Sequence, residues 1–358
     1  MFQNETKMTP SPNVSHVRKL GLPIQNYVIL CIKPHFFEII ILRKRGFFMY
    51  NFRTDMADER HDIYKKTNKL ENIPGIETTE KIVDDKLKVN TVKIINSEGE
   101  KAIGKPIGTY ITIDVKNLKI ATDEEIEKAA NLVKDELKTV IDVHCNAEDE
   151  ILVVGLGNQF VTPDSLGPKV VSELEITRHF LKYTPQYVVE GTRSVCAVAP
   201  GVLGTTGIET SEIVKGIVEN IKPKLLIVID SLASKSIERI SSTVQISDTG
   251  IVPGGGVGNA REELSVNTIG IPVIAIGVPM VVESAVLVND CLDIFIEKLQ
   301  EEAKSNDYLN KLKEKDNYEE IKDSLNPTGY NMIVTPKEID DLIENMKDVV
   351  AGAINLSV

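Results

Sequence analysis

Three short runs of consecutive apolar residues mark the centre of the sequence. Each run stops at a glycine or an acid, since residues 151–154 precede Gly155, residues 225–229 precede Asp230 and residues 273–276 precede Gly277. Continuous apolar runs are typical of parallel strands that are buried on both faces. The segments between the runs have helical spacing, for example residues 210–220. The pattern predicts an α/β fold with a mostly parallel central sheet and helices on both faces.

A different pattern precedes these runs. Residues 81–118 alternate between apolar and polar positions and are interrupted by glycines, which predicts antiparallel strands with one solvated face. A helix should follow, because Thr122 and Glu125 form a capping box ahead of an apolar stripe at helical spacing. We therefore expect residues 56–145 to form an N-terminal arm and a small antiparallel β/helix subdomain, and residues 146–358 to form the α/β domain.

The last part of the chain should be helical. Residues 297–325 are highly charged and loosely patterned, which predicts a helical excursion or linker within the α/β domain. A final helix is expected after residue 335, with Thr335 as its cap, Pro336 in its first turn and Glu338 completing a capping box.

The first 48 residues differ from the rest in charge. They hold seven Lys or Arg against two Asp or Glu, a net charge of +5, so the remaining 310 residues carry −17 of the total of −12. Their apolar stretch contains charged residues and a proline, which argues against a membrane span or a signal peptide. We interpret residues 1–48 as an upstream extension that the native protein lacks, with Met49 as the start. An intact mass of native protein that included them would refute this.

Composition narrows the class of partner. A surface this acidic should repel nucleic acid and favour basic or neutral partners. The four cysteines are far apart and the five histidines form no zinc motif, so we expect free thiols in a reducing cytoplasm and no metal or other cofactor.

Two aspartates lie at the carboxyl ends of predicted strands, where the functional sites of parallel sheets are usually found. Asp164 follows the glycine-rich turn after the first apolar run, and Asp230 comes directly after the second. Two such carboxyl groups could share a proton, one acting as base on water and the other as acid toward a leaving amine. The simpler interpretation is that each caps the helix that follows it.

Glycines surround these acids. Gly155, Gly157 and Asn158 form a turn that resembles the start of a dinucleotide-binding motif, but Phe160 occupies the place of its third glycine. A second loop contains Gly254, Gly255 and Gly256, which could hold an extended substrate or donate N–H groups to an oxyanion, or could be an ordinary mobile loop.

Several long motifs together resemble the germination protease family of spore-forming bacteria, over nearly everything after Met49. They are RTDMA at 53–57, GLGNQFVTPDSLGP at 155–168, APGVLGTTGIETSEIVKG at 199–216, VIDSLAS at 228–234, QISDTGIVPGGGVGN at 245–259, IPVIAIGVPMVV at 271–282 and NMIVTPKEID at 331–340.

The resemblance implies an endopeptidase of the forespore and spore core cytoplasm that degrades small acid-soluble spore proteins during germination. The family is grouped with atypical aspartic peptidases, and its two essential aspartates fall on Asp164 and Asp230 of this sequence. It also implies a homotetramer that needs no metal, while the acidic charge argues against direct contact with nucleic acid and the sequence predicts no membrane contact.

The resemblance further implies a zymogen that cleaves itself late in sporulation, triggered by acidification, dehydration and dipicolinate. The family cuts between an acidic residue and an apolar residue followed by alanine, which predicts cleavage between Asp55 and Met56, before Ala57. Residues 49–55 would then be the propeptide. This sequence departs from the family at Phe52, where substrates often carry an acid, and we expect the departure to slow processing.

Two other functions remain open at this stage. A hydrogenase-maturation-type peptidase shares a GxGN turn followed by an acid and a second acid after a later strand, but this chain has no histidine after His179 to contact nickel. A non-catalytic nucleotide-binding module could use the GLGN turn.

Overall fold

The computed structural model describes residues 54–116, 118–255, 261–303, 318–325 and 332–358, together with two short strands near the N-terminus. The chain divides into two units, Met1–Met49 and Tyr50–Val358. In the first unit, β1 (Tyr27–Val28) pairs antiparallel with β2 (Leu42–Arg43).

The described part of the second unit is built on one sheet of nine strands. Its order is β3-β4-β5-β9-β10-β8-β6-β7, and β11 pairs with β10. The strands are β3 (Ile76–Ile82), β4 (Leu87–Ile94), β5 (Gly108–Val115), β6 (Ile151–Gly155), β7 (Val195–Val198), β8 (Leu225–Ser234), β9 (Thr243–Ser247), β10 (Val273–Glu283) and β11 (Ile333–Val334).

The strand directions divide the sheet in two. Strands β10, β8, β6 and β7 run parallel to one another, and the strands from β3 to β9 pair antiparallel and join β10. The α/β fold predicted from the apolar runs is confirmed. The alternating segment before residue 118 extends the same sheet, because β5 hydrogen-bonds to β9.

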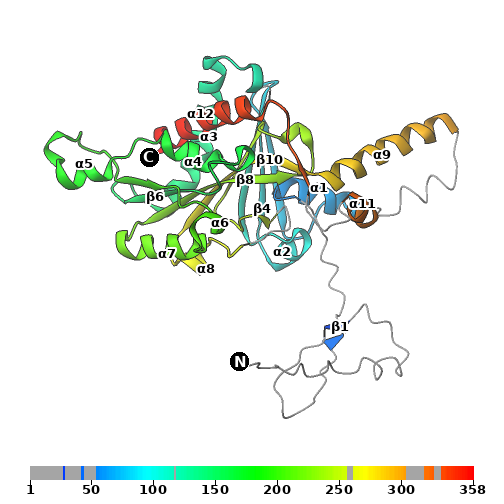
Figure 1. Cartoon of the computed structure of the whole chain (residues 1–358), viewed down its shortest axis with the longest axis horizontal. Coiled ribbons are helices and arrows are strands. Elements are labelled where there is room, and N and C mark those ends of the chain that lie inside the picture. Colours follow the sequence, from blue (N-terminus) through cyan, green and yellow to red (C-terminus); the bar gives the residue numbers. More distant parts are fainter. Residues whose placement is uncertain are drawn as a thin grey trace, which may run out of the picture. The chain divides into compact units, whose positions relative to one another are not determined.

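Helices cover both faces of the sheet (Figure 1). The longer ones are α1 (Ala57–Asn68), α3 (Asp123–His144), α7 (Thr210–Ile221), α9 (Ser284–Ala303) and α12 (Ile339–Ser357). The shorter ones are α2 (Ser97–Ile103), α4 (Leu166–Ser172), α5 (Arg178–Tyr183), α6 (Leu203–Thr206), α8 (Val266–Ile269) and α11 (Tyr318–Leu325). The described residues also form the single 3-10 turns η3 (Leu118–Ile120), η4 (Thr162–Asp164), η5 (Pro185–Tyr187) and η6 (Ile237–Arg239).

Alternate residues of the buried strands point to opposite cores. Ile151 and Val153 of β6 pack into the large core under α3, α4 and α12, whereas Leu152 and Val154 pack into a smaller core under α7 and α8. Figure 1 shows these two groups of helices on opposite sides of the sheet. Burial on both faces explains why the strand sequence has no polar positions.

Helix ends follow the sequence signals in one case and not in another. The capping box of Thr122 and Glu125 is present at the start of α3 and confirms the prediction. The predicted cap at Thr335 is wrong, because α12 begins only at Ile339 and the Thr335 hydroxyl donates to the Met280 carbonyl of β10 at 3.0 Å. Pairing of β11 with β10 places Thr335 at the sheet, where a strand carbonyl is its nearest acceptor.

Two strands continue past their predicted ends. The apolar run before Asp230 extends to Ser234 in β8, and the run before Gly277 extends to Glu283 in β10. Asp230 therefore lies inside a strand, opposite Gly277, and cannot cap a following helix. The predicted charged excursion at 297–325 includes the end of α9 and all of α11, and the residues between them lie outside the described part.

Packing of α3 against the sheet gives a direct test of the large core. The Leu137 side chain is fully buried in that core, whereas Val143 on the same helix is 76% exposed. We expect Leu137→Ala to lower the free energy of unfolding by about 2–5 kcal/mol, because it leaves a cavity. The control Val143→Ala should change it by less than about 0.5 kcal/mol. Urea unfolding curves of both variants measure this, and similar losses would contradict the described core.

Candidate active site

Asp164 sits in a tight turn at the carboxyl end of β6. The Asn158 main-chain N–H donates to both the Asp164 main-chain oxygen and its Oδ2, each at 2.9 Å. The carboxyl group makes no capping bond to α4, which begins at Leu166 without a side-chain cap. Asp164 is therefore aimed back across its own turn and does not cap a helix.

The glycines of this turn are explained by contacts inside the protein. A Cβ on Gly157, which has φ +108°, would lie 2.0 Å from the Asp164 main-chain oxygen. A Cβ on Gly155 would lie 2.2 Å from the Gly167 oxygen of α4. Both positions need glycine so that the strand, the aspartate turn and the helix can approach closely. They shape the site of Asp164, and this role needs no bound phosphate.

Asp230 is the more deeply buried acid, with 5% of its surface exposed. Its Oδ1 accepts a hydrogen bond from the Ser231 N–H at 2.9 Å. Burial raises the pKa of Asp230 well above its usual value, and the negative charges of Asp164 and Asp55 raise it further. Burial also raises the pKa of Asp164, although the Asn158 N–H opposes that shift. Of the two aspartates, Asp230 therefore has the more strongly raised pKa.

A cavity of about 410 Å³ brings the predicted residues together. Its lining includes Asp55, Gly157, Asn158, Asp164, Asp230 and Gly254. Gly155 packs behind it, Gly255 lines an adjoining cavity of about 230 Å³, and Gly256 lies outside the described residues. Asp55 lines both cavities and so lies between them.

The Asp55 main chain is held against the end of β8. Its N–H donates to the Ala233 carbonyl at 2.9 Å, and the Ala233 N–H donates to Asp55 Oδ2 at 3.0 Å. Two further bonds come from Gln245 of β9, whose Oε1 accepts from the Ala57 N–H at 2.7 Å and whose Nε2 donates to the Asp55 carbonyl at 3.4 Å. The Asp55–Met56 peptide bond is therefore bracketed from two strands.

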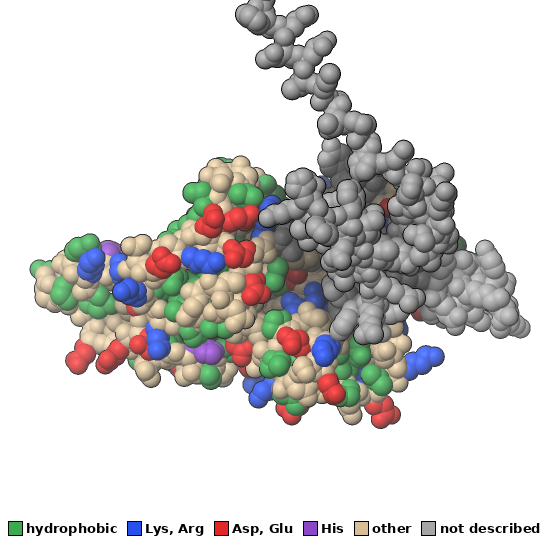
Figure 2. All heavy atoms as spheres, turned by 90° about the horizontal axis from the view of Figure 1, so that it is seen from below, with side chains coloured by type: hydrophobic (Ala, Val, Ile, Leu, Met, Phe, Trp, Pro, Cys, Tyr) green, Lys and Arg blue, Asp and Glu red, His purple; other side chains and the backbone are tan. Residues whose placement is uncertain are grey.

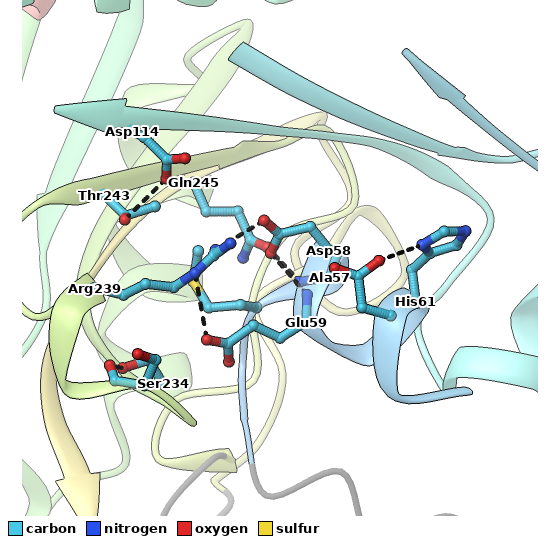
Figure 3. Close-up of polar contacts among 12 residues, drawn as sticks. Ala57, Asp58, Glu59, His61, Asp114, Ser234, Arg239, Thr243 and Gln245 are labelled. Carbon is cyan, nitrogen blue, oxygen red and sulfur yellow. Dashed lines mark hydrogen bonds and ion pairs between the residues drawn. The ribbon is translucent and has the colours of Figure 1, made fainter. Parts of the chain in front are cut away.

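Just after this bond, a buried ion cluster anchors α1 (Figure 3). Arg239 lies between two acids, with its Nη1 2.7 Å from Asp58 Oδ2 and its Nε 3.4 Å from Glu59 Oε1. Glu59 Oε2 also accepts from the Thr54 hydroxyl and from the Lys235 N–H. Burial raises the pKa of both acids, and the Arg239 charge opposes the rise. The cluster fixes where the chain passes the cavity.

Sequence reasoning missed Gln245, Ala233 and this ion cluster. The sequence held one signal for Gln245: an amide side chain in a strand whose residues are all buried must find hydrogen-bond partners there. Arg239 gave none, because it meets Asp58 and Glu59 from 180 residues away in the chain. Among the described residues, no cluster of three or more His, Cys, Asp or Glu side chains could hold a metal ion. No described helix has both the length and the hydropathy of a membrane span.

The raised pKa of Asp230 predicts how stability depends on pH. A carboxyl group whose pKa is higher in the folded state stabilises the fold at low pH, and this stability is lost as pH rises through the folded pKa. We expect Asp230→Asn to match the wild type near pH 4 and to exceed it increasingly above that. The difference in free energy of unfolding should grow by up to about 1.4 kcal/mol per pH unit. Denaturant unfolding from pH 4 to 8 measures it, and a difference independent of pH would refute it.

The close contact at Gly157 predicts a large effect of one methyl group. Gly157→Ala should lower the free energy of unfolding by roughly 2 kcal/mol more than Gly191→Ala does. Gly191 also has a positive φ of +88°, but a Cβ there meets nothing within 4 Å, so it controls for backbone strain alone. Thermal unfolding of both variants decides the matter, and equal losses would mean that the turn around Asp164 can relax.

Comparison with known proteins gives a consistent result. The family model described as germination protease matches residues 53–312 and 307–358. A germination protease of Clostridium acetobutylicum is 45% identical over 316 residues, covering 87% of this chain and 96% of the relative. One from Clostridium perfringens is 45% identical over 314 residues, with 87% and 96% covered. One from Priestia megaterium is 40% identical over 349 residues, with 86% and 94% covered.

A solved structure also matches in part. It is a [NiFe] hydrogenase maturation protease, HycI, from Thermococcus kodakarensis, 17% identical, covering 40% of this chain and 80% of that chain, with a TM-score of 0.26. The family model and the relatives span nearly the whole of the second unit, and on their strength the chain belongs to the germination protease family, a family of proteases.

Proposed function

We propose that this protein is a self-processing aspartic endopeptidase that cleaves its own Asp55–Met56 bond. The observation that carries the proposal is the place of Asp55, which lines the cavity of Asp164 and Asp230 and pairs with Ala233 three residues after Asp230. A segment bound in this way presents its backbone as an extended substrate would. Residues 49–55 act as the propeptide, and Met56 becomes the new N-terminus.

The unequal environments of the two aspartates assign their roles. Asp230, with the higher pKa, carries the shared proton, and Asp164, held by the Asn158 N–H, is ionised. Asp164 accepts a proton from a water molecule while the oxygen of that water attacks the Asp55 carbonyl carbon. Asp230 supplies its proton toward the product amine as the bond from that carbon to the Met56 nitrogen breaks. The products are a carboxyl group on Asp55 and a free amine on Met56.

Local charge supports a preference for an acid before the cleaved bond. Arg60 and Lys105 line the adjoining cavity together with Asp55. Burial and the charge of Arg60 lower the pKa of Lys105 to about 8, and the negative charge of Asp55 opposes this. An acidic side chain at this position thus relieves repulsion between two cations. The Ala233 N–H adds a hydrogen-bond donor for it.

The substrates that we propose are small acid-soluble spore proteins, cleaved in the spore core during germination. The family name of the relatives supports a role in germination. We also propose a homotetramer. Exposed apolar side chains around α5 and η5, at the left end of the face in Figure 2, suit a subunit contact: Phe180, Tyr183, Tyr187 and Val189. On that face acidic and basic side chains are interspersed, which suits protein more than nucleic acid partners (Figure 2).

Self-processing gives the test of this function. We expect the full chain, incubated at mildly acidic pH with dipicolinate, to gain a new N-terminus at Met56, by N-terminal sequencing and intact mass. Asp164→Asn and Asp230→Asn should stay uncut, and Asp142→Asn, a partly exposed residue of α3, should process like the wild type. The rate should fall as pH rises through the raised pKa of Asp230, because its proton is lost. Normal processing by either site variant would show that the two acids are not the catalytic pair.

A further inference from the structure

The two strands that bracket the Asp55–Met56 bond have different partners for it. Strand β8 offers main-chain groups, which any sequence could supply. Strand β9 offers one side chain, Gln245, which contacts the segment on both sides of the bond. Figure 3 shows the Gln245 side chain reaching toward Ala57.

We propose that Gln245 is a further catalytic residue, which binds the carbonyl oxygen of the bond to be cleaved and holds the N–H two residues later. This inference rests on the proposed cleavage at Asp55–Met56. Gln245 Nε2 donates to the Asp55 carbonyl at 3.4 Å, and Gln245 Oε1 accepts from the Ala57 N–H at 2.7 Å. One amide group thus fixes the register of the peptide and faces the oxygen on which negative charge develops.

The chemistry of hydrolysis needs such a donor. When water attacks the Asp55 carbonyl carbon, the oxygen of that carbonyl gains negative charge in the tetrahedral transition state. Asp164 and Asp230 are acids and repel that charge when ionised. A neutral amide N–H stabilises it without adding a proton to the shared pair. The 3.4 Å contact is long for a resting hydrogen bond, and it should shorten as the charge builds up.

Burial supports a dedicated role for Gln245. It lies within β9, between Thr112 of β5 and Gly277 of β10, and only 7% of its surface is exposed. A buried amide costs free energy unless it is paired, and both hydrogen-bond partners of this side chain in the described part of the chain lie in the segment around the bond. The neighbouring position on β10 is Gly277, which the Leu232 side chain of β8 covers, and Asp230 pairs with Gly277 on its other side. Gln245 and Asp230 are therefore two strands apart across the sheet.

The rival explanation is that Gln245 only anchors α1. Ala57 lies after the bond to be cleaved, so its hydrogen bond to Oε1 does not require that bond to be intact, and an anchoring role would be structural. The two explanations differ in which half of the amide matters. Anchoring needs the acceptor Oε1, whereas stabilising the carbonyl oxygen needs the donor Nε2.

Gln245→Glu separates the two halves. The introduced carboxylate keeps an acceptor for Ala57 and replaces the donor with a second acceptor. We expect the first-order rate of self-processing of the full chain near pH 7 to fall about 10²-fold relative to the wild type. As pH falls toward about 4.5, the introduced carboxyl group gains a proton and can donate again, so the ratio of variant to wild-type rates should rise at least about tenfold. The charged groups that line the adjoining cavity and tune this recovery are Asp55, Arg60, Lys105 and Glu263.

Thr112→Val is the matched control. Thr112 is the direct neighbour of Gln245 on β5, is 1% exposed, and its hydroxyl has no hydrogen-bond partner in the described part of the chain. Its rate should stay within about twofold of the wild type. A carboxylate buried at position 245 also destabilises the fold at pH 7, so circular dichroism of Gln245→Glu at pH 7 and pH 4.5 must show the same folded state before its rates are compared.

Each outcome decides the question. If Gln245→Glu follows the wild type at every pH while Asp164→Asn and Asp230→Asn stay uncut, Gln245 is only an anchor and the proposed function stands. If the variant is slow but its ratio to the wild type does not rise at low pH, a catalytic donor is again excluded. If an aspartate variant processes while Gln245→Glu shows the loss and recovery, the carbonyl assignment stands and the aspartate pair falls. If the wild type never cuts Asp55–Met56, both proposals fall together.

Discussion

Two carboxyl groups that share a small, partly buried cavity resist being ionised together, and this constraint governs the site. Asp230 lies inside a strand with little access to water, and Asp164 lies close enough to raise its pKa further. The protein does not relieve the repulsion by pairing Asp230 with a cation, since its only hydrogen-bond donor in the described structure is the Ser231 N–H. At Asp164, the Asn158 N–H donates to the carboxyl group and opposes the rise in its pKa. Burial therefore raises the pKa of both carboxyl groups, and the neighbouring negative charges raise the pKa of Asp230 further.

The sheet explains how the two acids meet. Strands β6 and β8 are parallel neighbours, so the turn after β6 opens beside the second half of β8. Glycines at 155 and 157 allow that turn to fold tightly onto α4, and the turn then directs Asp164 toward the cavity. Strand β8 continues past Asp230, and its last residues provide the edge to which Asp55 binds. The same strand thus supplies an acid and a binding surface for the chain that the acid faces.

The segment before α1 is positioned by groups of different kinds. Buried charges hold it on the far side of the bond through Asp58, Glu59 and Arg239, and two hydrogen bonds between Asp55 and the Ala233 main chain hold it on the near side. A buried ion cluster of this kind contributes little net stability but fixes geometry, because breaking it leaves a charge unpaired. This arrangement holds Asp55 in the lining of the cavity that Asp164 and Asp230 also line. Gln245 contacts both sides of that bond from a third direction.

The sequence by itself determined the α/β class, the central buried strands, the start of α3 and the two acids, because hydrophobic periodicity and turn residues are local signals. Long shared motifs also identified the family. The sequence misplaced the ends of β8 and β10 and the cap at Thr335, because whether a strand continues depends on a neighbouring strand, and that neighbour is distant in the chain. Only the tertiary structure decided that Asp55 lies in the cavity of Asp164 and Asp230, that Arg239 meets Asp58 and Glu59, and that Gln245 reaches Ala57. These contacts join residues roughly 110 to 190 positions apart, and no local pattern encodes a distance that only the packing of the sheet creates.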